Sequence, residues 1–289
     1  MLNKTLFMMF LLSAGSALLM GAWPGSSASP AKLTRSAFVA QALELETDIV
    51  GSDLSASELL EKALARLEPD HVSWLKTKIR QTMADGRTSF VADGFLQRGP
   101  RNCAHLKMDV LTNGQCATLL IISDGNLIAE VKKIPHRPAF ERVTHLQPED
   151  TSTQPTAPPV NEASLNARGC GGPTALLEQL CEHLQTSTPQ TGLLQGRPVI
   201  RIKGEVQAGK PPVLVGTAIP VQAVAVYLDA KTLWPVQFEW WGEDKGQTLR
   251  PLLQIEFQDP ELNQELSLEE CVRMFSYHPE GNVGTVEVE

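Results

Sequence analysis

The sequence predicts an α+β protein in which helices flank a long run of antiparallel strands. Capping boxes of the Ser-x-x-Glu type occur at residues 55–58 and 267–270, each followed by apolar residues at helical spacing. Between them, Asp-Gly at 85–86 and Asn-Gly at 113–114 are dipeptides that favour hairpin turns. Helices that bracket a series of hairpins are typical of the α+β class.

Composition narrows the class of protein further. The chain has 289 residues, of which 42% are hydrophobic and 20% charged, so it has enough apolar residues to build a core. The formal net charge is −8 at pH 7, which gives no positive surface for general nucleic-acid binding. We therefore expect a globular protein with no nucleic acid among its partners.

The first 28 residues have the pattern of a secretory signal peptide. Lys4 precedes a short apolar stretch, and Ser26 and Ala28 place small residues at the −3 and −1 positions of a cleavage site. A membrane anchor is the alternative, but the sequence Ser-Ala-Gly-Ser interrupts the apolar stretch. We expect a signal peptide over residues 1–28, a single domain over residues 29–289, and a periplasmic or otherwise exported protein.

The Asn-Gly turn at 113–114 predicts a hairpin with a definite register. With these two residues as the turn, Met108 lies opposite Leu119, and the apolar residues of both strands share one face. The stretch at 119–122 is apolar on both faces. This pattern is typical of a central strand that is covered on both sides or lines an apolar hollow.

A second hairpin is predicted around the Asp-Gly turn at 85–86. With a two-residue turn, Ile79 lies opposite Ala92 and Gln81 lies opposite Phe90, which also gathers apolar side chains on one face. Taken together, the two hairpins present one apolar face that is made of Ile79, Phe90, Ala92, Leu106, Met108, Val110, Leu119 and Ile121.

The remaining elements follow from local patterns. We expect helices at 38–49, at 59–67 up to Pro69 and at 174–184 after Pro173, a Pro- and Thr-rich loop at about 148–164, and strands at 127–133, 198–206, 221–229, 234–241 and 249–257.

The five cysteines allow at most two disulfides, and the sequence does not choose among the pairings. Cys103 and Cys181 each belong to a Cys-x-His sequence, but no Cys-x-x-Cys pair accompanies them, so we expect no metal and no cofactor. Cys170 stands in a Gly-rich stretch before a helix, where a helix dipole lowers a thiol pKa and makes a nucleophile. A structural cysteine is the favoured interpretation, because no base partner is apparent, and we expect no catalytic residue.

Four motifs resemble those of the periplasmic lipoprotein-carrier superfamily, the LolA-like or outer-membrane lipoprotein-sorting proteins. They are Ile-Ile-Ser-Asp-Gly at 121–125, the Asp-x-x-Thr hairpin at 226–236, the strand exit at 257–263 and the Phe…Pro-x-Gly sequence at 275–281. Their order is that of the family. The resemblance implies a curved antiparallel half-barrel whose concave face is covered by helices, with the apolar face described above lining a cavity.

The resemblance also implies a function. Family members carry acylated lipoproteins across the periplasm, receive them at the outer membrane, or sense lipidic stress signals, and none is known as an enzyme. We therefore expect a carrier that binds the acyl chains of lipid or lipoprotein without covalent chemistry. One alternative is an envelope-stress sensor of the same fold that contacts an envelope membrane protein. A Cys-dependent enzyme centred on Cys170 is the second alternative.

One residue is a candidate for closing the cavity. Arg98-Gly99-Pro100 resembles the Arg-Pro of the carriers, whose Arg latches the helical lid. Here a Gly intervenes, and Cys103 stands near the place of the expected aromatic residue. The resemblance thus implies that Arg98 is a lid latch, whereas the residue pattern alone favours a solvated residue at a strand end.

Overall fold

The protein was studied as a computed structural model, which describes residues 54–68, 71–84, 89–112, 114–145, 165–166, 168–206, 220–243, 249–278 and 286–288. The expected signal peptide, the helix at 38–49, the Asp-Gly turn at 85–86 and the loop at 148–164 lie outside these residues. Among the described residues, no helix is both long enough and apolar enough to cross a membrane.

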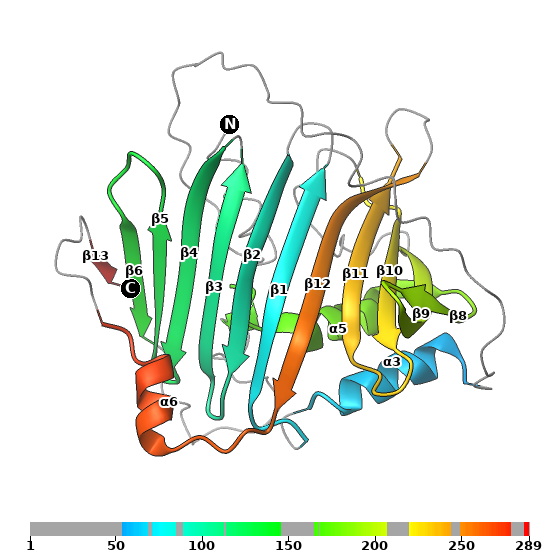
Figure 1. Cartoon of the computed structure of the whole chain (residues 1–289), viewed down its shortest axis with the longest axis horizontal. Helices are drawn as coiled ribbons and strands as arrows, with labels where there is room; N and C mark the ends of the chain where they lie inside the picture. The colour runs from blue at the N-terminus through cyan, green and yellow to red at the C-terminus, as the bar shows by residue number, and fades with distance from the viewer. Residues whose placement is uncertain are drawn as a thin grey trace, which may run out of the picture.

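A single sheet of 13 strands dominates the fold (Figure 1). Its order is β13-β6-β5-β4-β3-β2-β1-β12-β11-β10-β9-β7, and β8 pairs with β9 outside this path. All described pairs are antiparallel except β13 with β6. The strands are β1 (Leu75–Ala84), β2 (Ser89–Arg98), β3 (Cys103–Thr112), β4 (Gln115–Asp124), β5 (Leu127–Lys133), β6 (Phe140–His145), β7 (Leu184–Thr186), β8 (Gln190–Leu194), β9 (Arg197–Val206), β10 (Ala223–Asp229), β11 (Pro235–Gly242), β12 (Arg250–Leu262) and β13 (Val286–Val288).

In the described part of the chain, three helices accompany the sheet: α3 (Ala56–Ala65), α5 (Gly172–His183) and α6 (Leu268–Phe275). Both predicted capping boxes are present. In the first, Ser55 Oγ accepts a hydrogen bond from the Glu58 backbone, and Glu58 Oε2 accepts one from the Ser55 backbone. Each box satisfies backbone donors that a helix start leaves without a partner, which explains why the two helices begin where the sequence predicts.

The two faces of the sheet differ in polarity because side chains alternate along each strand. We call the face that carries Met108 and Leu119 the inner face. It is continuous with the buried core, and Ile79, Phe257 and Phe238 belong to it on neighbouring strands. The other face, the outer face, carries charged side chains such as Asp109.

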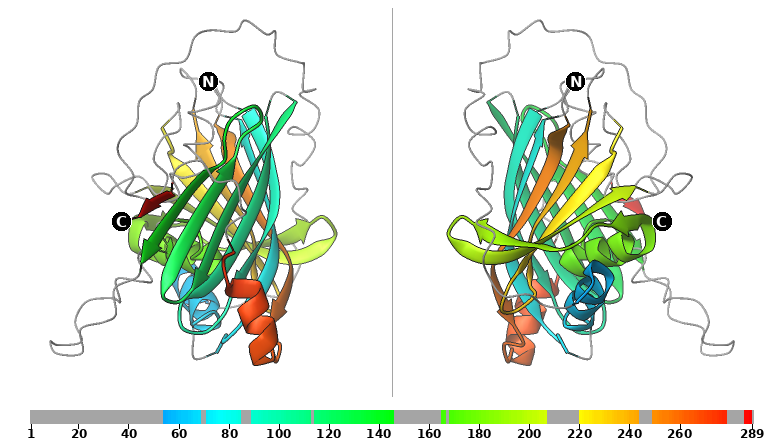
Figure 2. Two further views of the ribbon diagram at one scale, coloured as in Figure 1. Left: turned by 90° about the vertical axis from the view of Figure 1, so that its left-hand side faces the viewer. Right: turned by 90° about the vertical axis from the view of Figure 1, so that its right-hand side faces the viewer.

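The helices divide between these two faces. α3 and α5 lie in contact with each other beside the sheet, which is curved in the views of Figure 2. Arg66 at the end of α3 donates to the Thr232 carbonyl and so joins this helix to the turn after β10. α6 contacts β3 and β4 instead, and His105 Nδ1 on the outer face donates to the Met274 carbonyl at 3.0 Å. α6 therefore lies on the outer face of the sheet.

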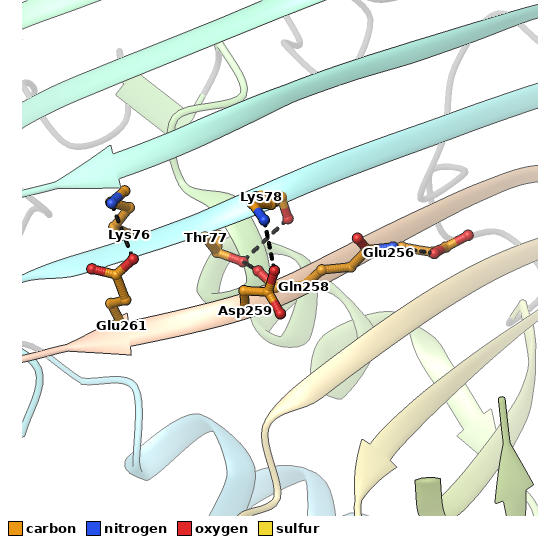
Figure 3. A network of polar contacts seen from close by, with 7 residues as sticks. All are labelled: Lys76, Thr77, Lys78, Glu256, Gln258, Asp259 and Glu261. Atoms are coloured by element: carbon orange, nitrogen blue, oxygen red, sulfur yellow. Dashed lines mark hydrogen bonds and ion pairs between the residues drawn. The ribbon is translucent and has the colours of Figure 1, made fainter. Parts of the chain in front are cut away.

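Strands from distant parts of the chain meet where β1 pairs with β12. A bulge there sets Thr77 against an extra residue of β12, and Thr77 Oγ1 donates to the Gln258 carbonyl at 2.9 Å (Figure 3). This bond satisfies a hydroxyl that is fully buried. The pair Lys76–Glu261, at 3.0 Å, flanks the bulge on the exposed side, where water and salt screen the attraction.

The predicted register is correct for one hairpin and wrong for the other. Met108 pairs with Leu119, as the Asn-Gly turn predicts. In the β1–β2 hairpin, however, Ile79 pairs with Gly94 rather than with Ala92. Four residues, not two, connect the last pair, so the register slips by two positions. A shift of two positions leaves each side chain on its predicted face of the sheet. The same residues therefore form the apolar face as in the predicted register.

Candidate ligand-binding site

A small pocket lies between α5 and the inner face of the sheet. Its volume is about 60 Å³. The strands supply a largely apolar floor, made of Ile79, Gln81, Leu106, Met108, Leu119, Ile255 and Phe257. The opposite wall comes from α5 and the segment before it, with Asn166, Arg168, Gly169, Gly171, Gly172, Ala175, Leu176 and Gln179.

Half of the predicted apolar face lines this pocket. Ile79, Leu106, Met108 and Leu119 are among the lining residues. The other four, Phe90, Ala92, Val110 and Ile121, are buried within the core and do not line it.

Gly94 of β2 belongs to the same part of the inner face but does not line the pocket. On the inner face it stands between Ile79 of β1 and Met108 of β3. A Cβ at this position would lie 1.9 Å from the Lys107 carbonyl oxygen and 2.7 Å from Met108 Sδ, so the neighbouring strand approaches too closely for any side chain. No residue of β2 lines the pocket among the described residues, and the floor consists of side chains from the strands on either side.

A glycine pair allows α5 to lie close to the sheet. Gly172 has a φ of +59°, and a Cβ there would lie 2.4 Å from Leu96 Cδ2 on β2. A Cβ on Gly171 would lie 2.4 Å from the Ala175 Cβ. A larger residue at Gly172 would push the start of α5 away from β2, whereas one at Gly171 would meet α5 itself and Asn166. In the sequence, these glycines are visible only as the Gly-rich stretch around Cys170.

The predicted lid latch contacts the same segment. Arg98 is the last residue of β2, and its Nη1 donates to the carbonyl of Gly171 at 3.3 Å. Gly171 is the N-cap residue of α5 and has no side chain with which to cap the helix. The guanidinium of Arg98 therefore joins the sheet to the start of the helix that covers the pocket.

The pocket wall also contains polar groups. Arg168, Asn166 and Gln179 line it from the helical side, and Arg168 Nη2 donates to Thr144 Oγ1 on β6 at 3.4 Å. Farther along the inner face, Glu130 is buried with its Oε1 2.6 Å from Lys132 Nζ. This ion pair supplies the charge balance that a buried carboxylate needs.

Cys170 lies next to the pocket but lacks the properties of a nucleophile. It is 1% exposed, and burial raises the pKa of its thiol to about 12, while Arg98 and Arg168 act in the opposite direction. At neutral pH the group is thus a thiol rather than a reactive thiolate. All five cysteines are free thiols in the structure.

The side chains that bind metal ions in proteins were searched for groups as well. Within the described part of the chain, no three side chains of His, Cys, Asp or Glu are grouped so that they hold a metal ion. Burial lowers the pKa of His105, the histidine of one Cys-x-His sequence, and its Nδ1 is used in the bond to α6.

No family model and no curated protein matches the chain. Solved structures match at low identity. An outer membrane lipoprotein-sorting protein domain from Vibrio parahaemolyticus is 11% identical over 75% of this chain and 96% of that chain, with a TM-score of 0.29. Mycobacterium tuberculosis lipoprotein LppX is 16% identical over 74% of this chain and 100% of that chain, with a TM-score of 0.39.

A further match is a chain of the Pseudomonas aeruginosa MucA/MucB complex. It is 15% identical, with a TM-score of 0.32, and the match covers 73% of this chain and 60% of that chain.

Proposed function

We propose that this protein is an exported carrier that holds an acyl chain of a lipid or lipoprotein between α5 and the inner face of the sheet. The observation that carries the proposal is the pocket at Gly94, where the apolar side chains of Ile79, Met108 and Leu119 face α5 across a hollow. Burial of an acyl chain contributes roughly 0.8 kcal/mol per methylene. Such a site needs no catalytic group.

The size of the pocket indicates a closed state of this carrier. An engineered apolar cavity that admits benzene measures roughly 150 Å³, and the pocket here has about 60 Å³. An acyl chain therefore enters only when the covering helices move away from the strands. In this proposal α3 and α5 form a lid over the concave face, and Arg98 holds the lid shut through Gly171.

The lipid that accompanies the protein during isolation tests the carrier proposal. The mature protein is purified without detergent, extracted with organic solvent, and the extract is analysed by mass spectrometry. We expect lipid with acyl chains in roughly equimolar amount to the protein. A protein that folds, retains its described fold and carries no lipid, even after incubation with membrane lipid extract, would contradict the proposal.

A second candidate is a sensor that acts by contact with an envelope membrane protein. One feature favours it: α6 exposes Leu268, at 82%, and Val272, one turn later, to solvent. Apolar residues in this position on a surface helix are typical of a contact surface. Substitution of both by Ser should abolish recovery of a cross-linked membrane partner from cells and leave lipid binding unchanged. Unchanged cross-linking would remove this candidate.

A further inference from the structure

We propose that Cys103 and Cys271 form a disulfide when the protein is in an oxidising compartment, and that this bond fastens α6 to the outer face of the sheet. Cys103 is the first residue of β3, and Cys271 lies in the middle of α6. Both are partly exposed free thiols in the structure, which therefore describes the reduced form. The bond would lie on the outer face and would not involve the ligand of the pocket.

The start of β3 and α6 lie against each other on the outer face. His105 follows Cys103 by two positions, so both side chains belong to the same face of β3, and His105 Nδ1 donates to the Met274 carbonyl at 3.0 Å. Gly99 provides a second point of reference. A Cβ at this position would lie 3.3 Å from Cys103 Cβ and 3.0 Å from Phe275 Cε2, so Cys103 and the Phe275 ring are beside the same backbone position.

The helical period brings Cys271 to the side of α6 that packs on the sheet. Cys271 precedes Phe275 by four residues, which places both side chains on one face of the helix. Side chains in a helix lean toward its N-terminus, so the Phe275 ring points back over the turn that contains Cys271. Exposure agrees with this orientation, because Phe275 is buried and Cys271 is partly buried, whereas Leu268 and Val272 are exposed.

The two thiols also influence each other electrostatically. Burial raises the pKa of the Cys103 thiol, and the charges of Asp124 and Cys271 raise it further, while Arg101 acts in the opposite direction. Charge interactions of this kind fade over roughly 10 Å where water reaches the groups. Together with the contacts between α6 and β3, the influence of Cys271 on Cys103 indicates that the two sulfur atoms are neighbours.

Cys116, the other cysteine on the outer face, lies too far from Cys103 to pair with it. Cys116 is opposite Leu111, and Leu111 is eight residues from Cys103 along β3, which corresponds to about 27 Å. A disulfide requires two Cα atoms within about 7 Å of each other. The length of the β3–β4 hairpin therefore separates these two thiols.

The remaining two cysteines lie on the other side of the sheet. Cys170 is buried just before α5, and Cys181 is an exposed residue in the last turn of that helix. The axis of α5 extends roughly 13 Å between its start and Cys181, which is more than a disulfide spans. The fold thus favours Cys103 with Cys271 among the pairings that the sequence leaves open.

Formation of the bond is a thiol–disulfide exchange with a disulfide of the compartment, either a small molecule or the oxidised form of a dithiol protein. The thiolate of one cysteine attacks a sulfur of this disulfide, forms a mixed disulfide and releases one thiolate. The thiolate of the second cysteine then attacks the sulfur of the first and displaces the other half of the reagent. The two cysteines lose two protons and two electrons, and the reagent leaves as two thiols.

The bond would give α6 a covalent attachment to β3. The exposed Leu268 and Val272 lie on this helix, so the attachment would hold their apolar surface in a fixed position on the sheet. Reduction would leave α6 dependent on noncovalent contacts such as the bond from His105 to Met274, and local opening of the helix should then be more frequent.

Peptide mapping of the mature protein tests the pairing. The protein is incubated with oxidised glutathione, alkylated, digested without reductant and analysed by mass spectrometry. We expect one linkage, between the peptides that contain Cys103 and Cys271, and alkylation of the other three cysteines. Absence of this linkage, or a linkage of either residue to another cysteine, would overturn the proposal.

Hydrogen exchange tests the attachment of the helix. The amides of α6 should exchange at least about tenfold more slowly in the oxidised protein than after addition of dithiothreitol. Cys271→Ser should exchange like the reduced protein with and without dithiothreitol. Cys116→Ser is the matched control, because Cys116 is exposed at the far end of the hairpin, and it should retain the full response.

The two measurements test separate parts of the proposal. Equal exchange of α6 in the oxidised and reduced protein would refute the fastening of the helix even if the linkage is found. The peptide map and the comparison with dithiothreitol both use the unaltered protein, so they decide the matter if Cys271→Ser does not fold. Neither measurement involves lipid, and failure of the carrier proposal would leave both expected results unchanged.

Discussion

Arg98 Nη1 donates a hydrogen bond to the carbonyl of Gly171 and thereby connects the end of β2 to the N-cap of α5. The two residues are 73 positions apart in the chain. Their contact is made next to Gly172, where a Cβ would lie 2.4 Å from Leu96 Cδ2 on β2. In the proposed carrier, opening of α5 requires this contact to break.

Removal of this contact should accelerate entry into the pocket. In Arg98→Gln the guanidinium is lost, so the open state of α5 should be more populated and the association rate of an apolar probe should rise severalfold. Stopped-flow fluorescence measures the rate, and hydrogen exchange of the α5 amides measures the opening. Arg101→Gln, an exposed change three residues later, is the control. Identical rates and exchange in the two variants would show that Arg98 is a strand-end residue without a latch role.

The close approach of α5 should be visible in stability. Gly172→Ala introduces a Cβ that meets Leu96 and also places Ala at a φ of +59°. Gly196→Ala provides a matched control, because Gly196 has a φ of +80° and nothing lies within 4 Å of the added Cβ. We expect Gly172→Ala to lower the free energy of unfolding by about 1–3 kcal/mol more than the control. Equal urea midpoints would argue that α5 does not pack as described.

The thiol of Cys170 should be unreactive at neutral pH. Burial raises its pKa to about 12, above the value in an unfolded chain, so folding favours the protonated form. The protonated Cys170 thiol therefore makes its full contribution to the free energy of unfolding at any pH below the pKa of a cysteine in the unfolded chain. This contribution is lost as the pH rises from that value toward about 12. Iodoacetamide labelling followed by mass spectrometry should therefore modify the exposed Cys116 well before Cys170. Faster labelling of Cys170 than of Cys116 would favour the alternative of a Cys-dependent enzyme.

Processing of the chain provides a separate prediction. If residues 1–28 are a signal peptide, the protein isolated from an exporting host should begin within a few residues of Ser29 and remain in the supernatant after carbonate washing of membranes. N-terminal sequencing determines the first residue. Full-length protein in the washed membrane fraction would instead identify an anchor.

The sequence predicted local structure better than it predicted the pocket. The β3–β4 register follows from an Asn-Gly turn together with apolar residues that demand one face, as at Met108 and Leu119. The Asp-Gly signal at 85–86 locates a hairpin but does not determine the length of its connection, and the register of β1 was therefore wrong by two residues.

The site itself depends on features that hydrophobic patterns do not contain. Gly94 leaves room for the Lys107 carbonyl and for the Met108 side chain of the pocket floor, and an interior strand glycine was the available signal for this close approach. Ile255 and Phe257 belong to the floor because β12 pairs with β1, although the two strands are far apart in the sequence. Local sequence does not determine such a pairing. Arg168 was missed as a lining residue because its place at the pocket depends on how the segment before α5 packs on the sheet, where Gly172 lies against Leu96.

The central claim is that the pocket beneath α5 binds an apolar chain, and a pair of tryptophan substitutions on β3 tests it most directly. Met108→Trp fills the pocket, whereas Leu111→Trp adds the same ring on the outer face, where Leu111 is 53% exposed. Overpacking at Met108 is expected to cost about 1–3 kcal/mol of stability, so both variants are first checked for cooperative unfolding. In titrations with 1-N-phenylnaphthylamine, Met108→Trp should bind at least about tenfold more weakly than the unaltered protein, and Leu111→Trp should bind equally well. A folded Met108→Trp protein that binds the probe as tightly as the unaltered protein would show that this face is only core and would contradict the account.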